Sequence, residues 1–137
     1  HVLPAMIRKF HEAKEDNHAS VVLWGSGTPL REFLHVDDLG QAVLFALEHK
    51  LDDHLYNVGS GSDLTIKALA KMIQKVIGHN GQVLWDDSKP NGTPKKLMDS
   101  YKLNKLGWKS SIELIDGIRK TYEWFLKFNQ LHKICYH

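Results

Sequence analysis

The sequence contains almost no cysteine and little excess charge. Cys135 is the one cysteine among 137 residues, so no disulfide can form within the chain. A lone thiol favours a reducing compartment, and we expect a cytoplasmic protein. Lys and Arg number 18 against 16 Asp and Glu, which gives a net charge of +2. We expect no nucleic-acid partner, because proteins that bind polyanions carry a larger positive excess.

Long apolar runs and a leader sequence are also lacking. No stretch approaches the roughly 20 apolar residues that cross a bilayer. The start, HVLPAM, has neither the basic region nor the cleavage pattern of a signal peptide. We therefore expect a soluble protein with no membrane partner. Because the chain begins at His1 rather than at methionine, we interpret it as a truncated piece of a longer protein.

Two kinds of chemical motif are incomplete. The nine histidines show no paired ligand spacing, so no metal site is predicted. No glycine-rich dinucleotide motif opens a helix after a strand, since the segment Gly59–Gly61 lacks the third glycine. Tyr122 has no lysine four residues later, whereas Tyr101 has Lys105 at that spacing but no glycine-rich motif to go with it. A complete dinucleotide site is therefore not predicted.

What is present is a regular alternation of helical and extended patterns. Thr65 or Asp63 is expected to cap the third helix, Gly78 to end it, and Ser110 and Ser111 to open the last helix with a capping box. The predicted helices span residues 3–14, 39–50, 66–77, 100–106 and 111–128, and the predicted strands span 21–24, 33–36, 55–58 and 83–85. Such an alternation with short connections is typical of an α/β domain.

The stretch from Val21 to Leu39, VVLWGSGTPLREFLHVDDL, combines a strand, a glycine turn, an arginine and a helix start. Glycines let backbone amides approach a ligand, and Arg31 beside them completes a candidate anion-binding corner. An ordinary hairpin with a surface arginine explains the same residues equally well. His35 is interpreted as a packed or hydrogen-bonded histidine rather than a ligand. Trp85 and Trp108 are interpreted as packing residues.

The helix predicted after Asp37 and Asp38 is apolar over most of its circumference. A helix with so little polar surface is normally covered on more than one side. This chain offers few partners for it, so we expect an exposed apolar patch on residues 39–50 and infer a missing neighbouring domain.

Four segments, WGSGTPLREFLHVDDL, YNVGSG, KPNGTPKKLMD and LGW, resemble the C-terminal part of the extended short-chain dehydrogenase/reductase superfamily of nucleotide-sugar epimerases and dehydratases. The resemblance implies an α/β substrate-binding portion over residues 1–128, a missing N-terminal Rossmann domain and a frayed tail over 129–137. The resemblance is narrower in two segments, HVLPAMIRKFHEA and KPNGTPKKLMD. These resemble the branch of the superfamily that converts GDP-4-keto-6-deoxy-D-mannose by NADPH-dependent 3,5-epimerisation and 4-keto reduction.

The resemblance also implies what binds and reacts. His1 aligns with the acid of the epimerisation, which pairs with an upstream cysteine, and it is also expected near the nicotinamide. In the family the NADP-binding glycines, the catalytic serine and the Tyr-x-x-x-Lys pair precede the position of His1. NADP(H) is therefore expected to be bound mainly by residues that this chain lacks, and the isolated chain is expected to be inactive. A homodimer is expected for the full-length protein.

The expected GDP-sugar contacts come from several parts of the chain. Arg31 is expected to bind the diphosphate and Trp24 to pack against the nucleotide sugar. Lys9, Asn91 and Lys96 are the other expected substrate contacts, and Lys96 is expected near the GDP. Relatives often have arginine at the position of Lys9 and aspartate at the position of Asn91. At Gln82, some relatives have arginine.

Two classes of function stay open. The first is part of an enzyme that acts with an N-terminal Rossmann domain, with another nucleotide-sugar epimerase or dehydratase as the runner-up. The second is a non-catalytic nucleotide-sugar-binding module on the same scaffold. A serine, a cysteine and a Tyr-x-x-x-Lys pair encoded upstream would support the enzyme.

Overall fold

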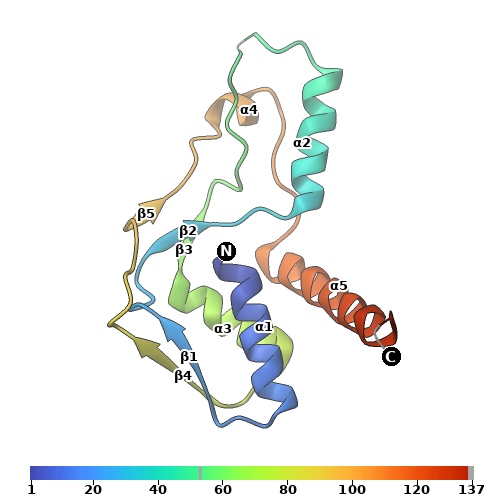
Figure 1. Ribbon diagram of the computed structural model, residues 1–137. Coiled ribbons are helices and arrows are strands. Elements are labelled where there is room, and N and C mark those ends of the chain that lie inside the picture. The colour runs from blue at the N-terminus through green and yellow to red at the C-terminus, as the bar shows by residue number, and fades with distance from the viewer. Residues whose placement is uncertain (53, 136–137) are drawn as a thin grey trace.

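Five helices and two small sheets make up the described part of the chain, residues 1–52 and 54–135 of a computed structural model, with side chains described to residue 128 (Figure 1). In chain order the elements are α1 (Val2–Glu15), β1 (Ser20–Trp24), β2 (Leu30–Glu32), α2 (Val36–Glu48), β3 (Asp63–Thr65), α3 (Ile66–Ile77), β4 (Gln82–Asp86), β5 (Lys95–Lys96), α4 (Tyr101–Lys105) and α5 (Leu114–Cys135).

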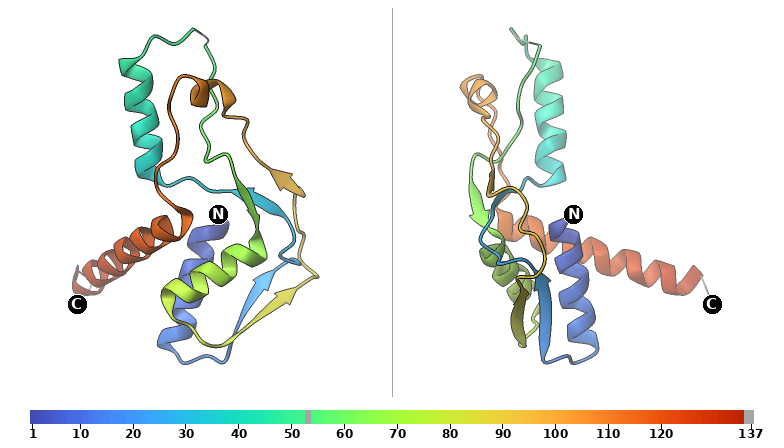
Figure 2. Two further views of the ribbon diagram at one scale, coloured as in Figure 1. Left: turned by 180° about the vertical axis from the view of Figure 1, so that it is seen from behind. Right: turned by 60° about the vertical axis from the view of Figure 1, so that its left-hand side comes forward.

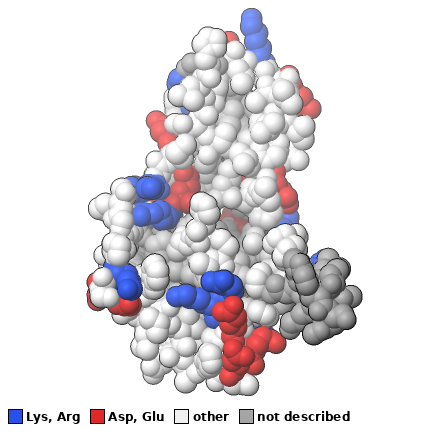
Figure 3. Space-filling model, in the orientation of Figure 1, with Lys and Arg blue, Asp and Glu red and all other residues white. Residues whose placement is uncertain are grey.

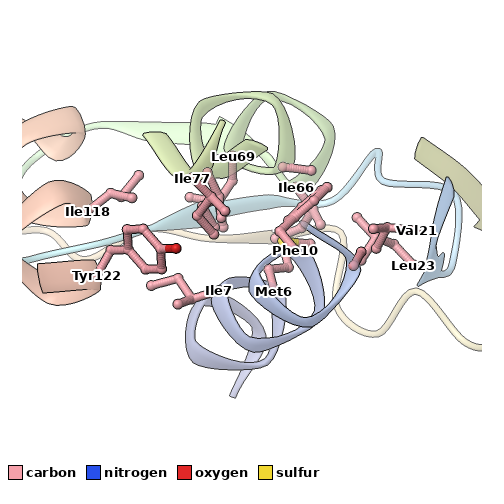
Figure 4. Packing of buried hydrophobic residues seen from close by; sticks show 13 residues of the cluster. Met6, Ile7, Phe10, Val21, Leu23, Ile66, Leu69, Ile77, Ile118 and Tyr122 are labelled. Carbon is pink, nitrogen blue, oxygen red and sulfur yellow. The ribbon is translucent and has the colours of Figure 1, made fainter. Parts of the chain in front are cut away.

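The first sheet holds β1 and β4 side by side and parallel, with Trp24 opposite Asp86. Side chains alternate across a strand, so Val21 and Leu23 of β1 point into the core while Trp24 points outward. Helices α1 and α3 pack on the inner side, and α5 closes the core with Ile118 and Tyr122 (Figure 4). The alternation therefore places an indole on the outer surface at the end of β1.

The second sheet has the order β3-β2-β5. Strand β2 pairs antiparallel with β3 and parallel with β5, and the second pairing sets Arg31 opposite Lys96. Residues more than sixty positions apart are thus brought together by strand register.

A smaller, second part extends from this body and contains α2 and α4, as both views of Figure 2 show. Its apolar cluster consists of Ala42, Leu103 and Trp108, with Phe45 and Tyr56 packed against it. Helix α5 projects away from α2 toward the C-terminal end (Figure 2).

The structure confirms most of the predicted elements. All five helices and the strands β1 and β4 are present, Thr65 Oγ1 accepts a hydrogen bond from Ala68 N, and Gly78 ends α3 in the left-handed conformation. The strand predicted over 33–36 is wrong, because the strand lies earlier, at β2, where its backbone has partners on both sides. The strand predicted over 55–58 is also wrong: this segment forms no ladder, and β3 pairs with β2 instead.

Two helix starts differ from the predictions. Helix α2 begins at Val36, before the predicted start at residue 39, and its N-cap is His35, whose Nδ1 accepts a hydrogen bond from Asp37 N at 3.2 Å. The capping box at Ser110 and Ser111 is not formed, because α5 begins only at Leu114 and the Ser111 hydroxyl bonds Asp38 instead.

Helix α5 is longer than predicted, since its backbone stays helical to Cys135. The sequence predicted a frayed tail over residues 129–137. The side chains of these residues, and the whole of residues 136 and 137, lie outside the described part of the chain, so the frayed tail stays a prediction.

The apolar face expected on the second helix is exposed. Val36, Leu39, Val43 and Leu47 recur at helical spacing along α2 and are 71, 46, 54 and 79% exposed. Among the described residues, no helix combines the length and apolar character needed to cross a membrane.

Candidate functional site

A pocket of about 190 Å³ lies beside the glycine turn that follows β1. Strands β1 and β2, the first turn of α1, the start of α3 and the loop after β4 all contribute to it. Its lining residues are Val2, Trp24, Gly27, Pro29, Arg31, Ile66, Pro90 and Asn91. Three of the predicted substrate residues are therefore brought to one place.

Arg31 is the cationic side chain that lines the pocket. It is half-buried on the central strand β2, and its Nη1 donates to the carbonyl of Leu30 at 2.7 Å. Its Nη2 lies near Gly92, 3.6 Å from where a Cβ would stand there. Within the described part of the chain Arg31 has no carboxylate partner, so its guanidinium remains available to an anion.

Trp24 forms an exposed wall of the pocket and is 67% accessible. The ammonium group of Lys9 lies 5.9 Å from the ring centroid and that of Lys89 lies 5.7 Å from it. Lys9 Nζ also donates to the carbonyl of Val22 at 2.8 Å, which fixes its position next to the indole. Both lysines are within the range of cation–π attraction.

Asn91 supports the glycine turn from the opposite loop. Its Oδ1 accepts hydrogen bonds from Ser26 N at 2.8 Å and from Ser26 Oγ at 3.0 Å. A Cβ on Gly25 would lie 2.5 Å from this oxygen, so the contact requires glycine there. The carboxamide oxygen thus organises the turn.

The other predicted residues lie around the pocket rather than in its lining. Lys96 is exposed and stands opposite Arg31 in the ladder of β2 and β5. His1 is exposed at the N-cap of α1, next to the pocket residue Val2. Gln82 stands at the far end of β4 from Asp86, the residue opposite Trp24, so it is not part of this site.

The pocket lies among basic groups. Lys9, Lys89 and Lys96, like Arg31, form no ion pair with a carboxylate in the described residues. On the face shown in Figure 3, Lys and Arg side chains lie over β5, near the end of β4 and over α1, with Asp and Glu side chains next to them. Converging cations with no carboxylate within ion-pair distance favour binding of an anion.

Sequence reasoning missed Glu32, which ties three segments together. Its Oε1 accepts from Gly61 N at 2.7 Å and from Ser60 Oγ at 3.3 Å, and its Oε2 accepts from Met98 N at 2.9 Å. Its position in the motif after Arg31 gave no sign of these partners, which come from distant loops.

The contacts of Glu32 also test the chain for a dinucleotide site. The Gly61 N–H, which a bound phosphate would need as a donor, already donates to the Glu32 carboxylate. A Cβ on Gly59 would lie 2.5 Å from the same carboxylate. The glycine turn of residues 59–61 therefore does not fit a dinucleotide phosphate. Separately, no group of three or more potential metal ligands occurs within the described residues.

Asp38 is a second residue that the sequence did not explain. It is 2% exposed and accepts hydrogen bonds from Ser111 N at 3.0 Å, Ser111 Oγ at 2.9 Å and Ile112 N at 3.0 Å. Burial by itself raises the pKa of this carboxyl, but the three hydrogen bonds together, with a contribution from His35, outweigh it and lower the pKa. Its hydrogen bonds are all with the segment before α5, and none involves a residue of the pocket lining.

Comparison with known proteins shows which family and which enzymes this chain resembles. Residues 1–59 match the NAD dependent epimerase/dehydratase family. Probable GDP-L-fucose synthase 1 of Oryza sativa subsp. japonica is 55% identical over 127 residues, which is 93% of this chain and 39% of the relative. GDP-L-fucose synthase of Escherichia coli (strain K12) is 48% identical, over 93% of this chain and 42% of the relative. The chain spans about two fifths of the length of these curated relatives.

A solved structure agrees with the sequence matches. A GDP-L-fucose synthetase from Naegleria fowleri, described as bound to NADP, superposes with a TM-score of 0.87 at 25% identity, over 95% of this chain and 41% of that one. The chain therefore has the α/β fold of the C-terminal portion of these enzymes, and its residues 1–59 resemble the NAD dependent epimerase/dehydratase family. Its sequence resembles the GDP-L-fucose synthases over 93% of its length.

Proposed function

We propose that this chain is the substrate-binding part of an NADPH-dependent GDP-L-fucose synthase, which converts GDP-4-keto-6-deoxy-D-mannose to GDP-L-fucose by 3,5-epimerisation and 4-keto reduction. One observation carries the proposal: Trp24, Arg31 and Asn91 line a single pocket whose neighbouring cations have no carboxylate partner in the described residues. The identity to GDP-L-fucose synthases over 93% of the chain supports this reading.

Each pocket residue has a role in binding the GDP-sugar. Arg31 presents a planar fork that suits the oxygens of a diphosphate. Trp24 offers an apolar face to the nucleotide sugar. Lys9 and Lys96 add positive charge at the rim, and Asn91 holds the glycine turn against which the ligand lies.

His1 is proposed as the acid of the epimerisation. A protonated imidazole can donate a proton to C3 or C5 of the enediolate after a base on the opposite face has removed one. His1 stands at the exposed start of α1, beside Val2 of the pocket, so its side chain is accessible to a sugar that extends from the bound nucleotide. The same position suits a histidine near the nicotinamide.

The cofactor belongs to another part of the enzyme in this proposal. NADPH supplies the hydride for the 4-keto reduction, but the residue 59–61 turn does not fit its phosphates. An N-terminal Rossmann domain is proposed to bind NADP(H) and to supply the cysteine, the serine and the Tyr-x-x-x-Lys pair. The chain alone then binds GDP-sugar without turnover, and the complete enzyme is proposed to be a cytoplasmic homodimer.

Tryptophan fluorescence tests the proposal on the chain itself. Titration with GDP is expected to change the emission of Trp24, the pocket indole, and Trp24→Phe is expected to remove that change. UDP is the matched control, and weaker binding of UDP supports a GDP-sugar enzyme. Equal or tighter binding of UDP would favour another nucleotide-sugar epimerase, and an unchanged signal with a flat calorimetric trace would contradict the site.

Joining the chain to an N-terminal Rossmann domain separates the enzyme from a binding module. The enzyme proposal predicts NADPH oxidation with GDP-4-keto-6-deoxy-D-mannose in the joined protein. Nucleotide binding without oxidation, in a joined protein that binds NADPH, would favour the non-catalytic module.

A further inference from the structure

A second lysine converges on the indole at the rim of the pocket. Lys89 Nζ lies 5.7 Å from the Trp24 ring centroid, as close as Lys9 Nζ at 5.9 Å. Lys9 comes from α1, whereas Lys89 comes from the loop after β4, the loop that also supplies Pro90 and Asn91 to the pocket. Two ammonium groups from separate elements therefore meet at one exposed side chain.

The position of Lys89 follows from a turn that Asp86 builds. Asp86 Oδ1 accepts hydrogen bonds from Ser88 N at 3.1 Å and from Ser88 Oγ at 2.5 Å, and the Asp86 carbonyl accepts from Lys89 N at 3.2 Å. Since Asp86 pairs with Trp24 in the β1–β4 ladder, the turn starts directly beside the indole. The register and the turn together direct Lys89 to the ring.

Positive groups are concentrated at this corner. Lys9, Lys89 and Arg31 have no carboxylate within ion-pair distance in the described part of the chain, although the Asp86 carboxylate attracts Lys89 from a longer distance. Asp86 and cation–π attraction to the indole offset part of the repulsion between the two lysines, and a bound anion would offset more of it. A ligand with several negative charges close together, such as a diphosphate, matches this pattern.

We propose that Lys89 is a further anion-contacting residue of the pocket and that Asp86 positions it. The proposal rests on the proposed nucleotide-sugar site and extends it. Trp24 holds the two ammonium groups near the entrance, and they move onto the diphosphate oxygens when the nucleotide enters. The loop after β4 thus contributes charge as well as shape to recognition.

Calorimetry with the 137-residue chain tests the role of Lys89. Lys89→Met is expected to weaken GDP binding by about threefold to tenfold, because a solvent-accessible charge-assisted contact is lost. Lys71→Met, which removes an exposed lysine of α3 outside the pocket lining, is expected to leave the affinity unchanged. Guanosine, which has no phosphate, is the second probe, and its binding is expected to be the same in both variants.

A double variant tests the positioning role of Asp86. Asp86→Ala, which removes the acceptor of both Ser88 hydrogen bonds, is expected to weaken GDP binding when Lys89 is present and to have no further effect in the Lys89→Met background. Circular dichroism checks that each variant is folded. Equal losses from Asp86→Ala in both backgrounds would contradict the positioning role.

The failure of the two proposals can be told apart. A wild-type chain that binds GDP together with a Lys89→Met variant that binds it equally well overturns the role of Lys89 alone. A folded wild-type chain that binds neither GDP nor inorganic pyrophosphate overturns the nucleotide-sugar site and, with it, the proposal for Lys89.

Discussion

Asp38 joins α2 to the segment before α5. The carboxylate is buried and accepts three hydrogen bonds from Ser111 and Ile112, residues more than seventy positions away. These two backbone amides lie just before α5 begins at Leu114. One side chain therefore fixes how the projecting helix leaves the body of the protein.

Asp38→Asn is expected to lower the free energy of unfolding by about 2 kcal/mol, because a carboxamide offers one acceptor where the carboxylate offers two and leaves a buried donor unsatisfied. Urea denaturation at pH 7 measures the change. Asp87→Asn, at an exposed aspartate of the loop after β4, is the matched control and is expected to change stability little. Equal midpoints for both variants would contradict the structural role.

The lowered pKa of Asp38 predicts a dependence of stability on pH. Its stabilising contribution is fully present above the unfolded-state pKa of about 3.9 and is lost as the pH falls below that value toward the lower folded-state pKa. Wild type is expected to lose more stability than Asp38→Asn between pH 5 and about pH 3. Parallel losses in urea titrations over this range would contradict the assignment.

At single positions, the sequence pointed to residues that line the pocket better than to residues that support it. Trp24 and Arg31 belong to a local motif, so their proximity follows from a short turn. Lys89 and Glu32 act through partners on distant loops, and their contacts depend on the register of β1 with β4 and on the path of residues 59–61. No local pattern encodes these pairings.

Among the elements, the turn after β1 depends most on its glycines. Gly27 has φ +74°, a conformation that L side chains rarely adopt, and a Cβ there would lie 2.7 Å from the Trp85 ring. The Gly27 carbonyl also accepts from Lys67 N at 2.8 Å, which connects the turn to the start of α3. Both conformation and space therefore require glycine at this position.

Gly27→Ala is expected to destabilise the fold by at least about 1 kcal/mol and to weaken GDP binding, because the turn must shift to admit a methyl group. Gly40→Ala is the matched control: Gly40 lies within α2 with no atom near the added Cβ, so alanine there is expected to stabilise the protein by about 0.5–1 kcal/mol. Thermal unfolding of both variants gives the signs. Stabilisation by Gly27→Ala would contradict the geometry of the turn.

Helices were predictable because their apolar periods are long, whereas the short strands were not. Strands β3 and β5 span three and two residues, too few for a period to be recognised. They exist because β2 offers a hydrogen-bonding edge on each side. The segment 55–58 has a strand-like composition but no such edge, so composition alone gave the wrong prediction.

For the molecule as a whole, the exposed face of α2 is the main unexplained surface of the described structure. Val36, Leu39, Val43 and Leu47 form an apolar stripe on a helix that packs through Ala42 and Phe45 on its other side. We propose that the remainder of a longer protein covers this stripe. The chain by itself leaves it in contact with water.

The isolated chain is expected to self-associate through the α2 stripe. Val43→Lys with Leu47→Lys is expected to reduce both the association and the binding of a hydrophobic dye. Trp124→Lys, at an exposed apolar residue of α5, is the control and is expected to have less effect. Light scattering over a concentration series measures the mass, and a monomeric wild type with no dye binding would rule out an exposed association surface.

We propose that GDP binds in the pocket of Trp24 and Arg31. Two-dimensional ¹H–¹⁵N spectra of the four tryptophan indoles, assigned through Trp24→Phe, report on this pocket. GDP is expected to shift the Trp24 resonance and to leave Trp108, buried in the α2–α4 cluster, and Trp124 on α5 unchanged. An unchanged Trp24 resonance at saturating GDP, or a shift confined to the other indoles, would show that GDP does not bind in this pocket.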